Sequence, residues 1–227
     1  MKDVDQYRLM PLLFGLTFVS GLIDAVSFLR LGHVFVANMT GNVVLLGFAI
    51  AGAQGISIIG SLIAIGLFMF GALIGGRLGR RHAESGAHLL WETTLTKIVL
   101  MLGAAAMAWF LGTGGIAGYA ITAVLAVSMG LQNAAARSLA IPDITTTVLT
   151  QTITGLAMDS KLAGGNNVRW RRRAASVVVM FAGALAGATL IFRANVSTAL
   201  IAAALVLAIV SIWAQRLAIS RRSTLSS

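Results

Sequence analysis

Two clusters of polar side chains interrupt stretches of the chain that are otherwise apolar enough for a lipid bilayer. The first is the run Asn38-Met39-Thr40-Gly41-Asn42, and the second lies about half a chain later, at 145–154. Hydrocarbon cannot hydrogen-bond either cluster, so these groups must satisfy one another or line a polar pathway. We therefore predict a substrate-binding site made of Asn38, Thr40, Gly41, Asn42, Thr147, Thr150, Gln151 and Thr154.

The first cluster indicates which class of solute such a site would bind. If Thr40 or Asn42 caps a short helix that begins at mid-membrane, its free amides and positive end favour an anion or a carbonyl-bearing solute. Gly41 would permit the turn and a close approach of the backbone to the ligand. The alternative is that these groups only satisfy one another where helices meet. We expect a neutral polar or anionic solute, no buried basic residue, and only Asp24 as an attraction for cations.

Asp24 is the single residue with the strongest functional signal. It lies within an apolar span and shares one helical face with Thr17, Ser20 and Ser27. A carboxylate inside a membrane is costly, so proton coupling or cation binding is its default interpretation. The alternative is an interfacial carboxylate near the outer end of the span that pairs with Arg30.

The composition excludes most soluble and catalytic classes. The chain has 58% hydrophobic residues, only 11% charged residues and no cysteine, whereas soluble domains carry about 25% charge. We expect a polytopic membrane protein without cofactor or metal. We expect no enzyme either, because no pair of side chains has the spacing of a nucleophile and its base. The net charge of +10 is attributed to cytoplasmic loops rather than to a nucleic-acid surface.

The helices that would hold these residues can also be predicted. Six segments meet the requirement of roughly 20 apolar residues for a span. They are 10–29, 56–76, 96–111, 116–136, 174–192 and 197–215, of which the third is short unless it begins in the polar run WETTLT at 91–96. The polar segments near 34–53 and 143–160 either span as well or enter and return. With two returning segments, fifteen of the seventeen basic residues, including Lys97, lie on one side, which the positive-inside rule identifies as cytoplasmic. We therefore expect about six transmembrane helices plus two re-entrant or broken helices, with both termini cytoplasmic.

A weak internal repeat relates the two halves. Gly21-Leu22-x-Asp24-Ala25 aligns with Gly130-Leu131-x-Asn133-Ala134, and Gly71-Ala72-Leu73-x-Gly75 aligns with Gly183-Ala184-Leu185-x-Gly187. Units at about 9–112 and 115–216 would each hold three spans, and this odd number makes the repeat inverted within a single membrane domain, 1–227. Asp24 thereby corresponds to the neutral Asn133, and these two are the candidate coupling residues. The glycine faces would pack helices within the monomer or in a homodimer.

Two stretches also resemble the motifs of a known family. The run GLIDAVSFLRLGHVFVANMTGNVVLLG, at 21–47, resembles the signature of the YoaK-like family of small bacterial membrane proteins, catalogued as domain of unknown function 1275. The later ITTTVLTQTITGL, at 144–156, is similar to its second, threonine-rich signature. The resemblance implies a bacterial inner-membrane protein with about six spans that is considered a permease without an established substrate. It supplies no catalytic residue to carry over.

These observations lead to two hypotheses of function. The first is a small-solute permease or secondary transporter with a polar site at mid-membrane, whose partners are the lipid bilayer and an unknown small polar solute. The alternative is a non-catalytic accessory or assembly protein that binds a partner span through its glycine-rich helix faces.

Overall fold

The computed structural model describes residues 2–139, 149–167 and 169–225. The elements in these ranges are α1 (Lys2–Arg30), α2 (Met39–Ile50), α3 (Ile58–Arg81), α4 (Gly86–Leu111), α5 (Gly115–Ser138), α6 (Leu149–Met158), the 3-10 helix η1 (Lys161–Ala163), α7 (Trp170–Arg193) and α8 (Val196–Leu225). Six helices, α1, α3, α4, α5, α7 and α8, are long and apolar enough to cross a membrane. The expected all-helical chain with six spans is confirmed for the described residues. The other two α-helices, α2 and α6, have only 12 and 10 residues.

Polar side chains placed just before several helices determine where those helices begin. In each case the side-chain oxygen accepts a hydrogen bond from the amide three residues further on, which satisfies a donor that the first turn leaves without a helical partner. The pairs are Asn38 with Gly41, Ser57 with Gly60, Ser85 with His88, and Asn195 with Thr198.

Helix α4 begins ten residues earlier than the sequence predicts, at Gly86 instead of Thr96. The polar run before Lys97 is helical because its hydroxyls bond to carbonyls inside the helix. Thr94 Oγ1 donates to Leu90 O at 2.7 Å, and Thr96 Oγ1 donates to Glu92 O at 2.9 Å. Lys97, which the count of basic residues placed on the cytoplasmic side at the start of this span, lies in the interior of α4.

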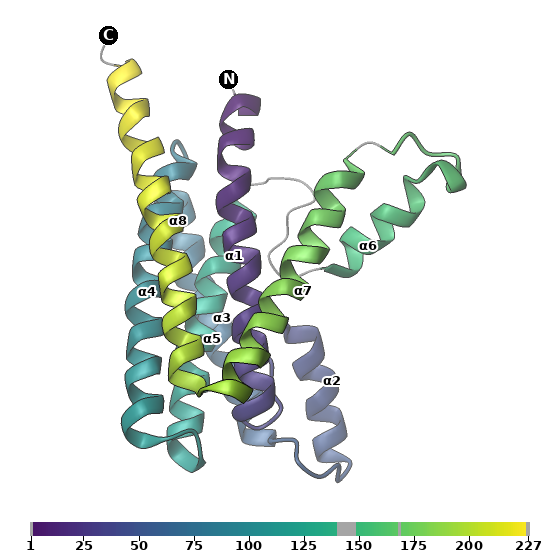
Figure 1. The fold of residues 1–227 in the computed structure, drawn as a ribbon, viewed down its shortest axis with the longest axis vertical. Helices are drawn as coiled ribbons and strands as arrows, with labels where there is room; N and C mark the ends of the chain where they lie inside the picture. Colours follow the sequence, from purple (N-terminus) through teal and green to yellow (C-terminus); the bar gives the residue numbers. More distant parts are fainter. Residues whose placement is uncertain (1, 140–148, 168, 226–227) are drawn as a thin grey trace.

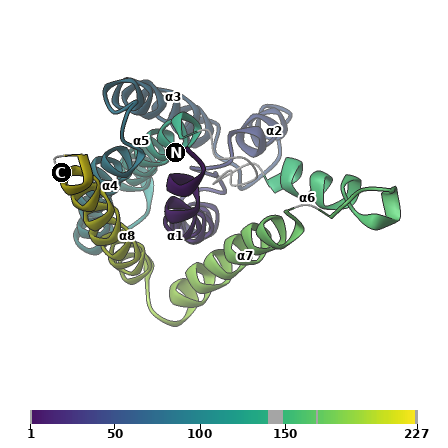
Figure 2. The same ribbon diagram turned by 90° about the horizontal axis from the view of Figure 1, so that it is seen from above.

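The six long helices form a bundle with two kinds of position (Figures 1 and 2). Helices α1 and α5 pack against each other, α5 also packs on α4, α1 also packs on α8, and α4 packs on α8, so that these four surround the centre. Helix α3 packs mainly on α5, and α7 packs mainly on α1. The N-terminus of α1 and the end of α8 lie at the same end of the bundle (Figure 1).

Glycines let two pairs of helices approach until their backbones touch. Between α1 and α7, a Cβ atom at Gly21 would overlap the carbonyl oxygen of Met180, and one at Gly183 would overlap that of Phe18. The α3–α5 contact is built in the same way. The other glycines in these two contacts are Gly71, Gly75, Gly130 and Gly187. The glycine faces are thus occupied inside the monomer.

The two short helices lie on the same side of the bundle. Helix α2 packs along α3 and runs from a first turn part-way along the bundle to the end where α1 stops and α3 starts (Figure 1). Helix α6 packs on α7 and extends away from the other helices (Figure 2). In both views the first turn of α2 and the first turn of α6 are neighbours.

Candidate functional site

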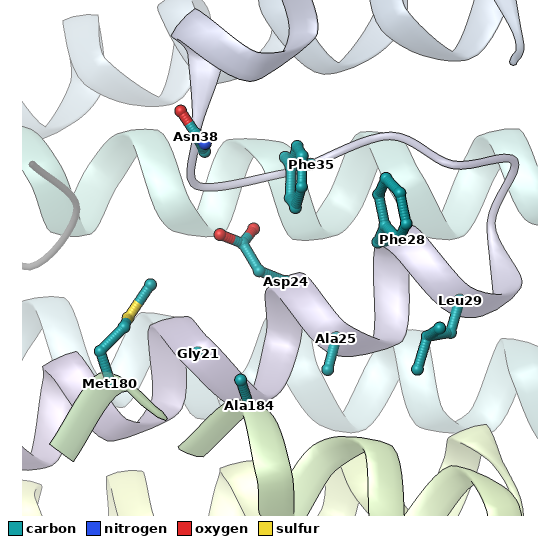
Figure 3. A pocket seen from close by; sticks show the side chains of 9 residues that line it. All are labelled: Gly21, Asp24, Ala25, Phe28, Leu29, Phe35, Asn38, Met180 and Ala184. Atoms are coloured by element: carbon teal, nitrogen blue, oxygen red, sulfur yellow. The ribbon is translucent and has the colours of Figure 1, made fainter. Parts of the chain in front are cut away.

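The carboxylate of Asp24 organises the chain between α1 and α2. After Arg30 the chain reverses at Gly32 and His33, both of which have a positive φ (+90° and +55°). It then runs back over the last turns of α1 (Figure 3). There Asp24 Oδ1 accepts the backbone N–H groups of Val36 at 3.2 Å and Ala37 at 2.9 Å. The buried carboxylate thereby satisfies two amides that have no helical partner at this depth.

Asn42 fixes the same segment from the α2 side. Its Oδ1 accepts the N–H of Phe35 at 2.8 Å, and its Nδ2 donates to Phe35 O at 2.5 Å. The side chain is fully buried, so both of its polar ends are committed to the backbone of one residue.

The helix cap of α2 differs from the prediction. We expected Thr40 or Asn42 to cap this helix, but Asn38 does so, with Oδ1 accepting from Gly41 N at 3.1 Å. Thr40 lies within the first turn and is exposed. A Cβ at Gly41 would meet the ring of Phe35. The glycine is therefore needed for packing of the aromatic ring.

A cavity of about 310 Å³ opens next to Asp24 (Figure 3). It is lined by residues of α1, of the 31–38 segment and of α7, namely Gly21, Asp24, Ala25, Phe28, Leu29, Phe35, Asn38, Met180 and Ala184. Asp24 and Asn38 are the two lining residues with polar side chains. Among the described residues no hydrogen-bond donor reaches Asp24 Oδ2. The cavity is therefore an open, mostly apolar pocket that offers one carboxylate oxygen and one side-chain amide.

The structure does not support the ion pair with Arg30 that the interfacial alternative for Asp24 included. Asp24 lies six residues before the end of α1 at Arg30, which is about 9 Å along a helix. It is only 8% exposed, and no ion pair joins it to Arg30 in the described structure. The ring of Phe28 stacks on Phe35 with centroids 4.9 Å apart and also meets His33 edge-on. These rings, together with the returning backbone, shield the carboxylate.

The second polar segment is not part of this cavity in the described structure. Thr150, Gln151 and Thr154 of α6 are exposed, whereas Thr152 is buried. Thr147 lies outside the described residues. Helix α6 is held by Arg173, whose Nη1 donates to Gly155 O at 2.6 Å and pairs with Asp159 Oδ2 at 2.5 Å. The sequence analysis attributed the basic residues to cytoplasmic loops and did not predict this contact.

Asn133, the repeat partner of Asp24, has a different environment. Its Nδ2 donates to Met129 O, one turn earlier in α5, at 2.9 Å. It is half-buried and does not line the cavity. The two candidate coupling residues therefore do not share a site.

A buried lysine is the main feature that sequence reasoning missed. Lys97 is fully buried, and its Nζ donates to Gln132 Oε1 and lies 3.8 Å from Met129 Sδ. Gln132 Nε2 in turn donates to Ser20 Oγ at 2.8 Å. The expectation of no buried basic residue is thus wrong. The usable signal was the capping residue Ser85, which starts α4 early enough to place Lys97 in mid-helix.

A second cavity of about 360 Å³ lies between the beginning of α4 and the last turns of α8. It is lined by His82, His88, Trp91, Glu92, Gln215, Ala218 and Ile219. His82 Nε2 and Glu92 Oε2 are 3.0 Å apart. In the described ranges no three side chains form a group that could hold a metal ion.

Comparisons with known proteins agree with the helical membrane architecture. The UPF0700 transmembrane protein YoaK of Bacillus subtilis (strain 168) is 33% identical over 153 residues, which is 65% of this chain and 65% of that protein. The match therefore spans slightly less than two thirds of the relative's length. No solved structure matches the chain. The family model described as "Protein of unknown function (DUF1275)" matches residues 12–213, from the first span to the last. The resemblance seen in the signature motifs is thereby confirmed, and this multi-pass transmembrane protein belongs to the DUF1275 family.

Proposed function

We propose that the protein is a permease or secondary transporter for a small polar solute, and that the solute binds in the cavity beside Asp24. The observation that carries the proposal is a buried carboxylate that lines a cavity of about 310 Å³ inside a membrane-spanning bundle. A polar group at membrane depth is retained at a cost and by default marks a solute or ion pathway. The dimensions suit a small molecule.

The chemistry of the cavity narrows the solute class. Asp24 Oδ2 accepts hydrogen bonds, Asn38 can donate or accept, and the other lining groups are apolar. A solute with hydrogen-bond donors fits this lining, while an anion would be repelled by the carboxylate. We therefore retain the neutral polar solute from the sequence-based prediction and abandon the anionic one.

The glycine contacts support an inverted repeat. Gly21 of α1 meets Met180 and Ala184 of α7. In the α5–α3 contact, Gly130 meets Phe68 and Ala72, which are the residues that the sequence alignment of the two halves assigns to the same places. The first span of each unit therefore makes the same close contact with the other unit, α1 with α7 and α5 with α3. We infer a pseudo-twofold axis that exchanges the units.

In this arrangement α2 and α6 are re-entrant half-helices. Their 12 and 10 residues correspond to about 18 and 15 Å, roughly half of the ~30 Å hydrocarbon thickness. Helix α2 begins beside the Asp24 cavity and ends where α3 starts, which supports entry and return on one side (Figure 1). Backbone that breaks a span is tolerated where it lines a cavity.

The basic residues support an orientation with both termini in the cytoplasm. Arg80 and Arg81 end α3, Arg137 ends α5, and Arg171 starts α7. These helix ends lie at the end of the bundle that carries both termini (Figure 1). The positive-inside rule makes that end cytoplasmic, and we expect the inner membrane of a bacterium. The chain has no cysteine, so single cysteines introduced at Ser85 and Ser160 should react only from inside and one at Gly114 only from outside.

The alternative function, an accessory protein that binds a partner through its glycine faces, is disfavoured by the contacts of these glycines within the chain. Gly71 and Gly75 contact the backbone of α5, and Gly183 and Gly187 contact that of α1. In the described structure helices of the same chain cover these four glycines, which counts against a partner helix or a homodimer at these positions.

Uptake by the purified protein in liposomes tests the proposal. A panel of radiolabelled neutral polar solutes, including small polyols, amides and zwitterionic amino acids, is compared with cation and anion tracers. Ala184→Leu fills the cavity and should abolish the uptake that the parent supports. Thr189→Leu, at an exposed position of the same helix, is the matched control and should behave as the parent. If no tracer enters faster than into empty liposomes, or if Ala184→Leu transports normally, the proposed site is wrong.

A further inference from the structure

Lys97 and Asp24 are the two charged side chains buried among the residues whose exposure is described. Lys97 lies eleven residues after the first residue of α4, Gly86, and its side chain has no exposed surface. In the described structure its Nζ contacts only the amide oxygen of Gln132 and the sulfur of Met129. A buried ammonium with neutral partners only is costly, and such charges are normally compensated by an opposite charge.

The hydrogen bonds around Gln132 have a defined direction. Ser20 Oγ donates to Leu16 O at 3.0 Å, so towards Gln132 it can only accept. Gln132 Nε2 must therefore be the group that lies 2.8 Å from Ser20 Oγ, which places Oε1 towards Lys97. Since Oε1 is an acceptor, Lys97 is the donor. The chain of donors thus runs from Lys97 on α4, through Gln132 on α5, to Ser20 on α1.

This chain ends one helical turn from the cavity carboxylate. Ser20 and Asp24 are four residues apart on α1 and therefore occupy one face of that helix. The three side chains of this hydrogen-bonded chain, Lys97, Gln132 and Ser20, are buried, and so is Asp24. Charges separated by dry protein interact over distances at which water would screen them.

We infer that Lys97 is the counter-charge of Asp24, held by Gln132 and Ser20 beside the face of α1 that also carries Asp24, and that the core is electrically neutral when both groups are ionised. Lys97 acts through other residues and does not contact the cavity, so it is a positioning and compensating residue. One consequence rests on the proposed function. Because the carboxylate is already compensated, a solute without net charge leaves the core neutral, whereas a cation adds an uncompensated charge.

A double-mutant cycle on the purified full-length protein in detergent tests the inference without any transport assay. The parent, Asp24→Asn, Lys97→Met and the double variant are compared by thermal unfolding. Each single variant leaves one buried charge without its counter-charge and should lower Tm by about 5 °C or more. The double variant removes both charges and should unfold at a higher temperature than the additive expectation, close to the better single variant. If the two shifts simply add, the charges are independent and the inference is wrong.

A matched control uses a carboxylate that is not buried. Glu92 lies on the same helix as Lys97, is about one third exposed and pairs with His82. Glu92→Gln combined with Lys97→Met should therefore give additive shifts. Coupling of the same size in this control would mean that the cycle reports general electrostatics, and it would overturn the specific pairing with Asp24.

A further variant, which relocates the carboxylate, tests the inference if one of the single variants does not fold. Asp24→Asn/Gln132→Glu moves the carboxylate from the cavity to the residue that contacts Lys97 directly. If Lys97 requires a buried negative charge, this variant should express and unfold above Asp24→Asn by several degrees. If it is no more stable than Asp24→Asn, Lys97 does not depend on a carboxylate. Because none of these measurements involves a solute, their failure would leave the permease proposal standing, and failed uptake would leave the charge pair standing.

Discussion

The two polar segments of the chain have similar composition but are held in different ways. Before α2, the returning backbone is bonded to Asp24 and to Asn42, both buried in the centre of the bundle. In the described structure α6 is instead bonded to Arg173, which belongs to the peripheral helix α7. The difference teaches that threonine and amide content does not itself create a site. Among the described residues, a buried carboxylate that satisfies backbone amides is found only in the first half of the chain.

The largest effect is expected from Asn42→Leu. The substitution keeps the number and branching of the side-chain heavy atoms but leaves the N–H and C=O of Phe35 without their partners. Loss of two buried hydrogen bonds should destabilise the protein by about 2–5 kcal/mol and lower Tm by about 5 °C or more. Thermal unfolding in detergent measures this. A shift below 2 °C would mean that the 31–38 segment does not depend on this anchor, and the contrast with α6 would lose its basis.

The next effect concerns transport and uses Asp24→Asn. Asparagine can still accept the amides of Val36 and Ala37 through its oxygen, so insertion into the membrane should persist. Concentrative uptake should be lost while passive exchange remains, because the group that carries the coupling charge is gone. Uptake with and without an imposed proton gradient, using a solute that the panel has identified, separates the two activities. An unchanged gradient dependence would exclude Asp24 as the coupling residue.

Adding Asn133→Asp to Asp24→Asn sharpens the same comparison. The double variant carries a carboxylate only at the equivalent position of the second half. Coupling should not return, since Asn133 does not line the cavity. Restored concentrative uptake would indicate that the two halves are functionally interchangeable.

Arg173→Met should have a smaller and more local effect. It removes the bonds to Gly155 and Asp159 and so releases α6 from α7, at a cost of about 1–3 kcal/mol. Limited proteolysis in the stretch 159–167 should accelerate severalfold, while the rate of cleavage in the 31–38 segment beside Asp24 should be unchanged. Accelerated cleavage in the 31–38 segment as well would show that the two polar segments are coupled.

Thr152→Val should have the smallest effect. Thr152 is the buried threonine of α6, yet no hydrogen bond of its hydroxyl is found in the described structure. The substitution keeps the branched shape, so Tm should stay within about 2 °C of the parent. A larger drop would assign this threonine a polar partner and would make the second segment more like the first.

The sequence by itself determined the membrane class, the six spans and the family, because hydrophobic length and short motifs are local properties of the chain. Only the tertiary structure decided which polar groups meet. Asn38 rather than Thr40 caps α2, and Asn42 bonds to the backbone of Phe35. Both outcomes depend on how residues 31–38 fold back over α1. The burial of Lys97 could not be predicted for a related reason. Its burial requires that threonines before it bond inside α4 and that Gln132 of α5 and Ser20 of α1 converge on the same point, and no spacing along one chain specifies a meeting of three helices.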